Sequence, residues 1–203
     1  MKAAFIVFDR ITSLDLIGFY DPVTRLKSMK IIEDFEWRIC ATARSVVDDR
    51  GLRIEADRVA EPLDSYDMVF LPGGFGTRTL QHDRAFVDWL KTATPVRLKV
   101  SVCTGALLLG AAGFLRGRRA TTHPSAYKEL EPYCGSVVRD RVVDEGDVVT
   151  AGGVSASIDA GLHIVQKLAG PEARARIAAQ MDYPYQWNDG AARADAPIDG
   201  TRP

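Results

Sequence analysis

One cysteine stands where the sequence changes from strand to helix. Val96–Val102 is typical of a strand, Cys103 and Thr104 follow it, and Gly105 opens a run of small and apolar residues that predicts a helix. This order predicts a sharp turn that presents a nucleophile beside the free amides of a helix N-terminus, as in the elbow of serine hydrolases. Because a helix N-terminus stabilises negative charge, we expect a lowered pKa for the Cys103 thiol. The alternative is a buried, inert cysteine.

The other two cysteines fit that alternative. Cys40 lies inside a predicted strand and Cys134 stands beside Gly135 in a predicted loop. Three cysteines without a CxxC pair are unlike the dense, even set of a secreted scaffold or the ligands of a zinc site. We therefore expect neither structural disulfides nor a bound metal.

Asp15 and His123 are the candidates for proton transfer. Asp15 lies between two leucines, where partial burial would raise the pKa of its carboxyl toward a value useful in acid–base catalysis. Its alternative role is that of a helix cap or first-turn acid. His123, in a Thr-Thr-His-Pro segment, is a candidate to hydrogen-bond near the thiol.

Two glycine turns follow predicted strands. Gly73 and Gly74, in Leu-Pro-Gly-Gly-Phe-Gly, can turn backbone amides toward a ligand or an oxyanion, and Gly152 and Val154 belong to a second such turn. The first turn lacks the Gly-Lys-Ser/Thr of a phosphate loop and the GxGxxG spacing of a dinucleotide fingerprint, so nucleotide binding is not supported. The alternative for both turns is a tight connection between strand and helix.

Alternating strand and helix patterns position these residues. We expect strands at 2–8, 37–41, 67–71 and 96–102, a short excursion at the sheet edge within 51–60, and a hairpin formed by 137–143 and 147–150. We expect helices at 13–27 (broken at Pro22), 84–94, 105–115 and 157–168, with a break at Gly170 before a further helix through Met181. The alternation predicts an α/β fold with a mainly parallel sheet, whose ligands bind at the carboxyl ends of the strands.

Length and composition limit the function classes. A chain of 203 residues that is 46% apolar fits one domain, which we place at 1–187, followed by a tail at 188–203. A net charge of -1 gives no basic field for nucleic acid. No apolar run is long enough to span a membrane and residues 1–8 do not resemble a signal peptide, so we expect a cytoplasmic protein.

Four segments together resemble the PfpI/ThiJ superfamily over residues 1 to about 181. They are LDLIGFYDP, FLPGGFG, VSVCTGALLLGAAGFLRGRRATTHP and TAGGVSASID. The resemblance implies a flavodoxin-like three-layer sandwich and a homodimer. The Asp of LDL, the Cys-Thr-Gly elbow and the TAGG turn are most similar to those of isonitrile hydratases. In that group Cys103 would be the nucleophile, Asp15 the acid or base beside it, and Thr104 the residue after the nucleophile, with Gly74 and Thr104 as backbone donors.

The resemblance implies a lyase that needs no cofactor and hydrates an isonitrile to an N-substituted formamide. Relatives of protease and amidotransferase type carry a His after the nucleophile, where this chain has Thr104, and regulators with a similar elbow carry a helix-turn-helix domain that we do not find after Met181. Two alternatives stay open: a glyoxalase or deglycase that acts on small dicarbonyls, and a redox sensor in which Cys103 is oxidised to a sulfinic acid. We expect the substrate pocket to be lined by Phe75, Phe19 and Tyr20 or by a second subunit.

Overall fold

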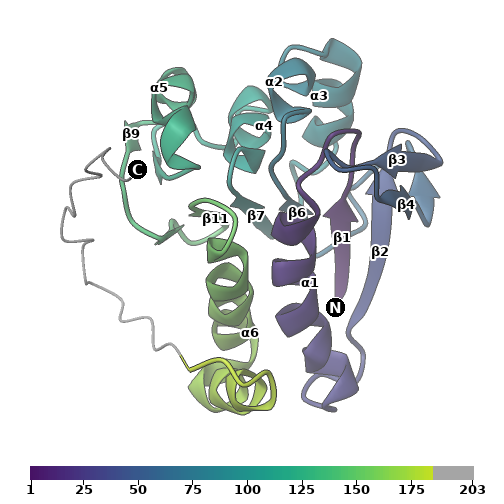
Figure 1. Cartoon of the computed structure of the whole chain (residues 1–203), viewed down its shortest axis with the longest axis vertical. Helices are drawn as coiled ribbons and strands as arrows, with labels where there is room; N and C mark the ends of the chain where they lie inside the picture. The colour runs from purple at the N-terminus through teal and green to yellow at the C-terminus, as the bar shows by residue number, and fades with distance from the viewer. Residues whose placement is uncertain (185–203) are drawn as a thin grey trace, which may run out of the picture.

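A seven-stranded sheet forms the centre of the protein in the computed structural model, which describes residues 1–184 (Figure 1). Its strands are, in spatial order, β10 (Val142–Asp144), β11 (Val148–Ala151), β7 (Leu98–Val102), β6 (Met68–Leu71), β1 (Lys2–Ile6), β2 (Glu36–Ala41) and β5 (Arg58–Val59). Every neighbouring pair is parallel except β10 and β11. The predicted α/β class with a mainly parallel sheet is therefore confirmed.

Helices pack on this sheet in two groups. They are α1 (Ser13–Ser28), α2 (Thr77–Leu80), α3 (Arg84–Lys91), α4 (Gly105–Ala111), α5 (Tyr127–Leu130) and α6 (Ala156–Gln180). Helices α1 and α6 lie side by side, whereas α4 packs on β6 and β7 and contacts α2, α3 and α5 (Figure 1). Two small sheets complete the fold: antiparallel β3 (Ser45–Val47) with β4 (Arg53–Glu55), and parallel β8 (Arg119–Ala120) with β9 (Ser136–Val137).

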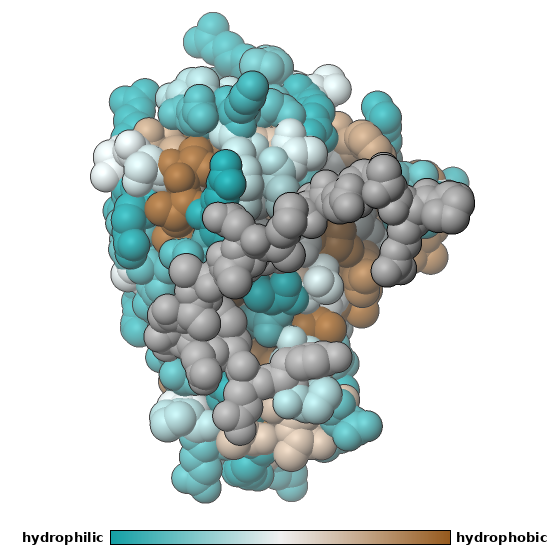
Figure 2. Space-filling view, turned by 60° about the vertical axis from the view of Figure 1, so that its left-hand side comes forward, coloured by the Kyte–Doolittle hydropathy of each residue, from teal (hydrophilic) through white to brown (hydrophobic). Residues whose placement is uncertain are grey.

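The core lies between the sheet and its helices. Phe19 of α1 stacks on Phe70 of β6 with ring centroids 3.9 Å apart, and Phe5 of β1 meets both rings edge-on. Central parallel strands covered on both faces are expected to be buried along their whole length. Strands β6 and β7 are buried at every position, including Lys99 and Ser101 of β7. On the face shown in Figure 2 hydrophilic side chains predominate, with small apolar patches between them.

Helix α1 is continuous, so the predicted break at Pro22 is wrong. Pro22 cannot donate the usual backbone hydrogen bond, but its ring packs directly against α6. A Cβ added to Gly161 would lie 2.5 Å from Pro22 Cγ, and one added to Gly18 would lie 2.1 Å from Ser157 Oγ. We infer that this close helix packing offsets the lost hydrogen bond, a tertiary effect that the local pattern does not contain.

The hairpin is confirmed and its first arm is shorter than predicted. The run 137–143 divides between β9 and β10, because Val138 N–H donates to Ala120 O while Arg141 O accepts from Gly152 N–H. The break at Gly170 is also found, with φ at 87° and Pro171 next in the chain. The tail at 188–203 and the domain end at 187 lie outside the described residues. None of the helices within residues 1–184 combines the length and apolarity that crossing a bilayer requires.

Candidate active site

Cys103 occupies a strained turn between β7 and α4. Its φ is 56°, in the left-handed region that non-glycine residues seldom adopt. The turn is fixed on both sides: Cys103 N–H donates to the carbonyls of Ala151 and Gly152, each at 3.0 Å, and Thr122 Oγ1 donates to Cys103 O at 2.7 Å. Glycine is required two residues later, at Gly105, since a Cβ there would lie 2.2 Å from Leu71 O. The predicted elbow is therefore present.

Asp15 reaches the same point from α1. Its side chain is fully buried, and Oδ2 accepts a hydrogen bond from Gly73 N–H at 2.9 Å. The carboxyl also contacts the Cys103 thiol, while Oδ1 has no partner that satisfies hydrogen-bond geometry within residues 1–184. Burial raises the pKa of Asp15 to about 6, although the bonds from Gly73 and Cys103 oppose that change. A carboxyl that titrates near neutrality beside a thiol can accept and return a proton.

The pKa of the Cys103 thiol differs from the sequence prediction. The backbone amides of Thr104 and Val154 donate to its sulfur and lower the pKa, as the helix N-terminus led us to expect. Burial and the negative charge of Asp15 outweigh them and raise the pKa to about 12. The prediction of a lowered pKa is thus wrong, because it considered the helix and not the carboxylate. The thiol keeps its proton until a base removes it, and Asp15 is the base in contact with it.

The amides of the first glycine turn are engaged within the protein. Gly73 N–H binds Asp15, and Gly74 N–H donates to Thr104 Oγ1 at 3.0 Å, so neither faces the pocket as the predicted oxyanion donor. Gly73 instead provides space: a Cβ there would lie 2.7 Å from Cys103 Cβ and 2.8 Å from Asp15 Oδ2. The amides that reach the sulfur are those of Thr104 and Val154.

The second glycine turn and His123 meet on the other side of the thiol. Gly152 acts through its carbonyl, which accepts from Cys103 N–H. Gly153 lets the His123 ring approach, since a Cβ there would lie 2.3 Å from His123 Cδ2. His123 Nδ1 interacts with Ser125 Oγ at 2.8 Å, and the residue lines the pocket rather than contacting Asp15.

A pocket of about 360 Å³ opens above the thiol. Its lining residues are Thr12, Leu14, Asp49, Arg50, Gly74, Phe75, Arg78, Cys103, Thr104, His123, Ser125 and Val154. Of the three predicted aromatic lining residues only Phe75 is there, whereas Phe19 and Tyr20 pack in the core around Phe5. No group of three or more metal-ligating side chains gathers anywhere in the described part of the chain.

Comparison with known proteins identifies the family of this chain. Residues 1–167 match the DJ-1/PfpI family. The chain belongs to the DJ-1/PfpI family. It is 35% identical to the isonitrile hydratase of Pseudomonas putida over 185 residues, which are 90% of this chain and 78% of that protein.

Other relatives in the DJ-1/PfpI family differ in function. The HTH-type transcriptional regulator CdhR of Pseudomonas aeruginosa is 29% identical over 72% of this chain, which spans 45% of that regulator. The crystal structure of a ThiJ/PfpI family protein from Pseudomonas syringae superposes with a TM-score of 0.82 at 26% identity, covering 96% of this chain and 78% of that one. The flavodoxin-like fold implied by the sequence is confirmed by this similarity. Family membership alone does not decide between enzyme and regulator.

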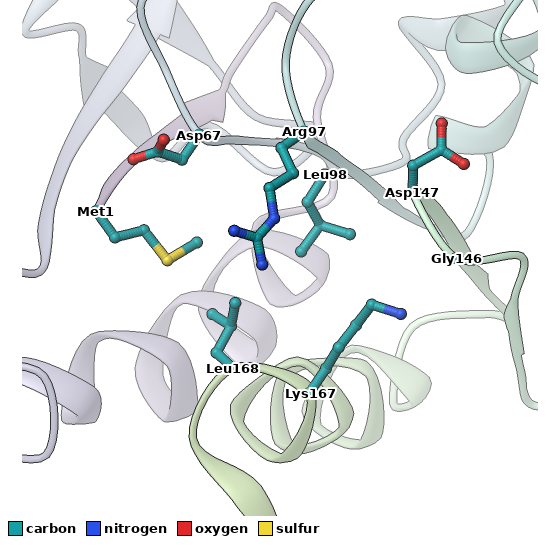
Figure 3. A pocket seen from close by; sticks show the side chains of 8 residues that line it. All are labelled: Met1, Asp67, Arg97, Leu98, Gly146, Asp147, Lys167 and Leu168. Carbon is teal, nitrogen blue, oxygen red and sulfur yellow. The ribbon is translucent and has the colours of Figure 1, made fainter.

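A larger cavity, of about 560 Å³, lies at the opposite edge of the sheet in this DJ-1/PfpI protein (Figure 3). Arg97 extends between Met1 and Leu168 there, and the lining residues include neither cysteine nor histidine. The side chain there that could act as a nucleophile is the Lys167 amine, but it donates to both oxygens of Asp144, at 2.8 and 2.9 Å. We therefore place the candidate active site in the smaller pocket, which is lined by Cys103, whose thiol contacts the buried Asp15 carboxyl.

Sequence reasoning missed several residues around the thiol. Thr122, which fixes the Cys103 carbonyl, stands next to His123, so the Thr-Thr-His-Pro segment contained a signal for it. Arg50 and Arg78 line the pocket from a loop beyond β3 and from α2, and each is paired with a carboxylate. Nothing in their local sequence indicates that these two segments approach Cys103.

Proposed function

We propose that this protein is an isonitrile hydratase, a lyase that converts an isonitrile and water to an N-substituted formamide. The observation that carries the proposal is the buried Asp15 carboxyl, whose pKa is about 6, in contact with the thiol of Cys103 at a strained elbow. The 35% identity to the isonitrile hydratase of Pseudomonas putida supports it.

In the first step the Cys103 sulfur attacks the terminal carbon of the isonitrile. Ionised Asp15 accepts the thiol proton as the carbon–sulfur bond forms, and then delivers that proton to the same carbon. The product is a thioimidate, in which nitrogen is doubly bonded to a CH that carries the sulfur. The amides of Thr104 and Val154 stabilise negative charge on sulfur while it develops.

In the second step water adds to the thioimidate carbon. Asp15 takes one proton from that water and passes it to the nitrogen as the double bond to carbon becomes single, which leaves a hydroxyl group on the carbon. The carbon–sulfur bond then breaks while Asp15 accepts the hydroxyl proton and the carbonyl of the formamide forms, and Asp15 passes that second proton to the sulfur. One water is consumed and the thiol is regenerated, so the cycle requires no cofactor.

The proposal predicts formamide production that depends on both groups. Wild-type protein supplied with a panel of alkyl and aryl isonitriles should form the matching formamides, measured by mass spectrometry. Cys103→Ala should be inactive, and Asp15→Asn should lose about 100-fold or more in kcat, the usual contribution of a general acid or base.

Turnover by wild type should also decline as pH falls below about 6, because Asp15 is then protonated and cannot accept the thiol proton.

Cys40→Ala is the matched control, since Cys40 is equally buried and lies in β2 away from the pocket. It should keep wild-type turnover, and the melting temperature of each variant excludes simple unfolding. A protein that leaves every isonitrile unchanged but converts methylglyoxal would refute the hydratase proposal in favour of the glyoxalase alternative. If Asp15→Asn keeps near-normal turnover, the proton has another source, and His123 is the next candidate.

A further inference from the structure

The loop before α6 contacts Cys103 at two points. The carbonyl of Gly152 accepts a hydrogen bond from Cys103 N–H at 3.0 Å. Two residues later, the amide of Val154 donates to the Cys103 sulfur. A displacement of this loop would therefore change both the turn that presents the thiol and one of the two backbone donors that stabilise its charge.

Arg141 holds this loop from the segment before β10. Its backbone carbonyl accepts from Gly152 N–H at 2.9 Å, and its Nη2 lies 3.4 Å from Ser155 Oγ. Its Nε donates to Asp159 Oδ2 at 2.5 Å. Arg141 thus holds Gly152 through its backbone carbonyl, and its side chain connects Ser155, at the other end of the loop, to Asp159 in the first turn of α6.

Asp159, the partner of the Arg141 side chain in α6, is buried. Asp159 is only 3% exposed, and its second oxygen accepts from Tyr183 Oη at 2.6 Å. A buried carboxylate paired in this way is costly to leave without its partner, so Arg141 is firmly retained. Of the residues 1–184, those that interact with the sulfur itself are Asp15 from α1 and the amides of Thr104 and Val154, and Arg141 acts only through the loop.

We propose that Arg141, paired with Asp159, is a positioning residue that sets the reactivity of Cys103 by holding the Val154 amide against its sulfur. This rests on the proposed function only in treating Cys103 as the nucleophile. It requires no particular substrate. Hydrogen bonds from backbone amides to a charged group depend steeply on distance and angle, so loss of the anchor should weaken the Val154 bond without removing any group that contacts the substrate.

Alkylation of the thiol tests this inference directly. In the full chain, the rate of Cys103 modification by iodoacetamide at pH 8, measured on its own peptide by mass spectrometry, is proportional to the thiolate fraction. Arg141→Met should lower this rate about 10-fold, the value of one hydrogen bond to a charged group. Arg141→Lys keeps a cation for Asp159 and should restore most of the rate.

Arg118→Met is the matched control. Arg118 makes a bidentate pair with Asp147 at 2.5 and 3.1 Å and has an exposure close to that of Arg141, but it has no bond to the loop. It should leave the alkylation rate unchanged while the melting temperature reports the loss of an ion pair. Equal rates in wild type and Arg141→Met, or equal losses in Arg141→Met and Arg118→Met, would overturn the inference.

Two further arms keep the test decisive. If Arg141→Met does not fold, Asp159→Asn keeps the shape of the anchor and removes its charge, and it should slow alkylation in the same direction. An unchanged rate in that variant would contradict a positioning role. A wild-type protein that hydrates no isonitrile, yet shows the predicted alkylation rates, would refute the proposed function and leave this inference standing.

Discussion

At the scale of single residues, burial of the Asp15 carboxylate in the active site lowers the stability of the folded protein. Its pKa rises from 3.8 to about 6 on folding because the carboxyl is fully buried. Below pH 4 both the folded and the unfolded chain bind this proton. Between pH 4 and pH 6 the unfolded chain releases it first, so the contribution of Asp15 to stability falls as pH rises, and the loss is complete above about pH 6.

Asp15→Asn should therefore be more stable than wild type at pH 8. A shift of about two pKa units corresponds to about 3 kcal/mol, and the gain should disappear as pH is lowered toward 4. Urea unfolding at pH 4, 6 and 8 measures it. Asp21→Asn is the control and should show no comparable gain, because Asp21 on the same helix is half-exposed and paired with Arg25. If Asp15→Asn is equally or less stable than wild type at pH 8, burial of the Asp15 carboxylate does not lower the free energy of unfolding.

At the scale of elements, the packing of α1 on α6 places Asp15. Gly18 and Gly161 leave room for Ser157 and Pro22, so the two helices approach closely. Gly161→Ala should destabilise the protein by about 1–3 kcal/mol through overpacking, although helix propensity alone favours alanine by about 1 kcal/mol. Thermal unfolding measures the sum of the two effects.

A double variant identifies the cause of that loss. Pro22→Ala removes the ring that a Cβ on Gly161 would meet at 2.5 Å, so Gly161→Ala should cost less in the Pro22→Ala background than in wild type. Equal costs in both backgrounds would show that Pro22 does not set the distance between the helices. Turnover should fall with helix displacement, since Asp15 moves with α1.

At the scale of the whole molecule, we propose a homodimer formed beside the pocket. Leu14 and Ile17 are 53% and 50% exposed on α1, and Phe75 is 56% exposed. Leu14 and Phe75 also line the pocket, so a second copy covering these side chains would close its mouth. Sedimentation at low micromolar concentration should give twice the 22.2 kDa of one chain, and Ile17→Glu should shift it toward monomer. Wild-type monomer at every accessible concentration would contradict this proposal.

Local sequence determined much of the architecture around the thiol. The apolar runs of β1 and β6, the strand pattern of β7, the small residues after Cys103 and the break at Gly170 are properties of neighbouring residues, and they predict strands, an elbow and a helix end. The family resemblance added the pairing of Cys103 with Asp15, which no local pattern contains because the two residues are 88 positions apart.

Tertiary structure alone decided the electrostatics of the site. The pKa of the Cys103 thiol rises because burial and the Asp15 carboxylate act together, and the helix N-terminus that suggested the opposite direction is a weaker effect. The amides of Gly73 and Gly74 bind protein acceptors, α1 continues through Pro22 because α6 packs on it, and Arg141 links the loop before α6 to the buried Asp159. Burial and contacts between distant segments set each of these outcomes, and neither quantity is present in a stretch of sequence read on its own.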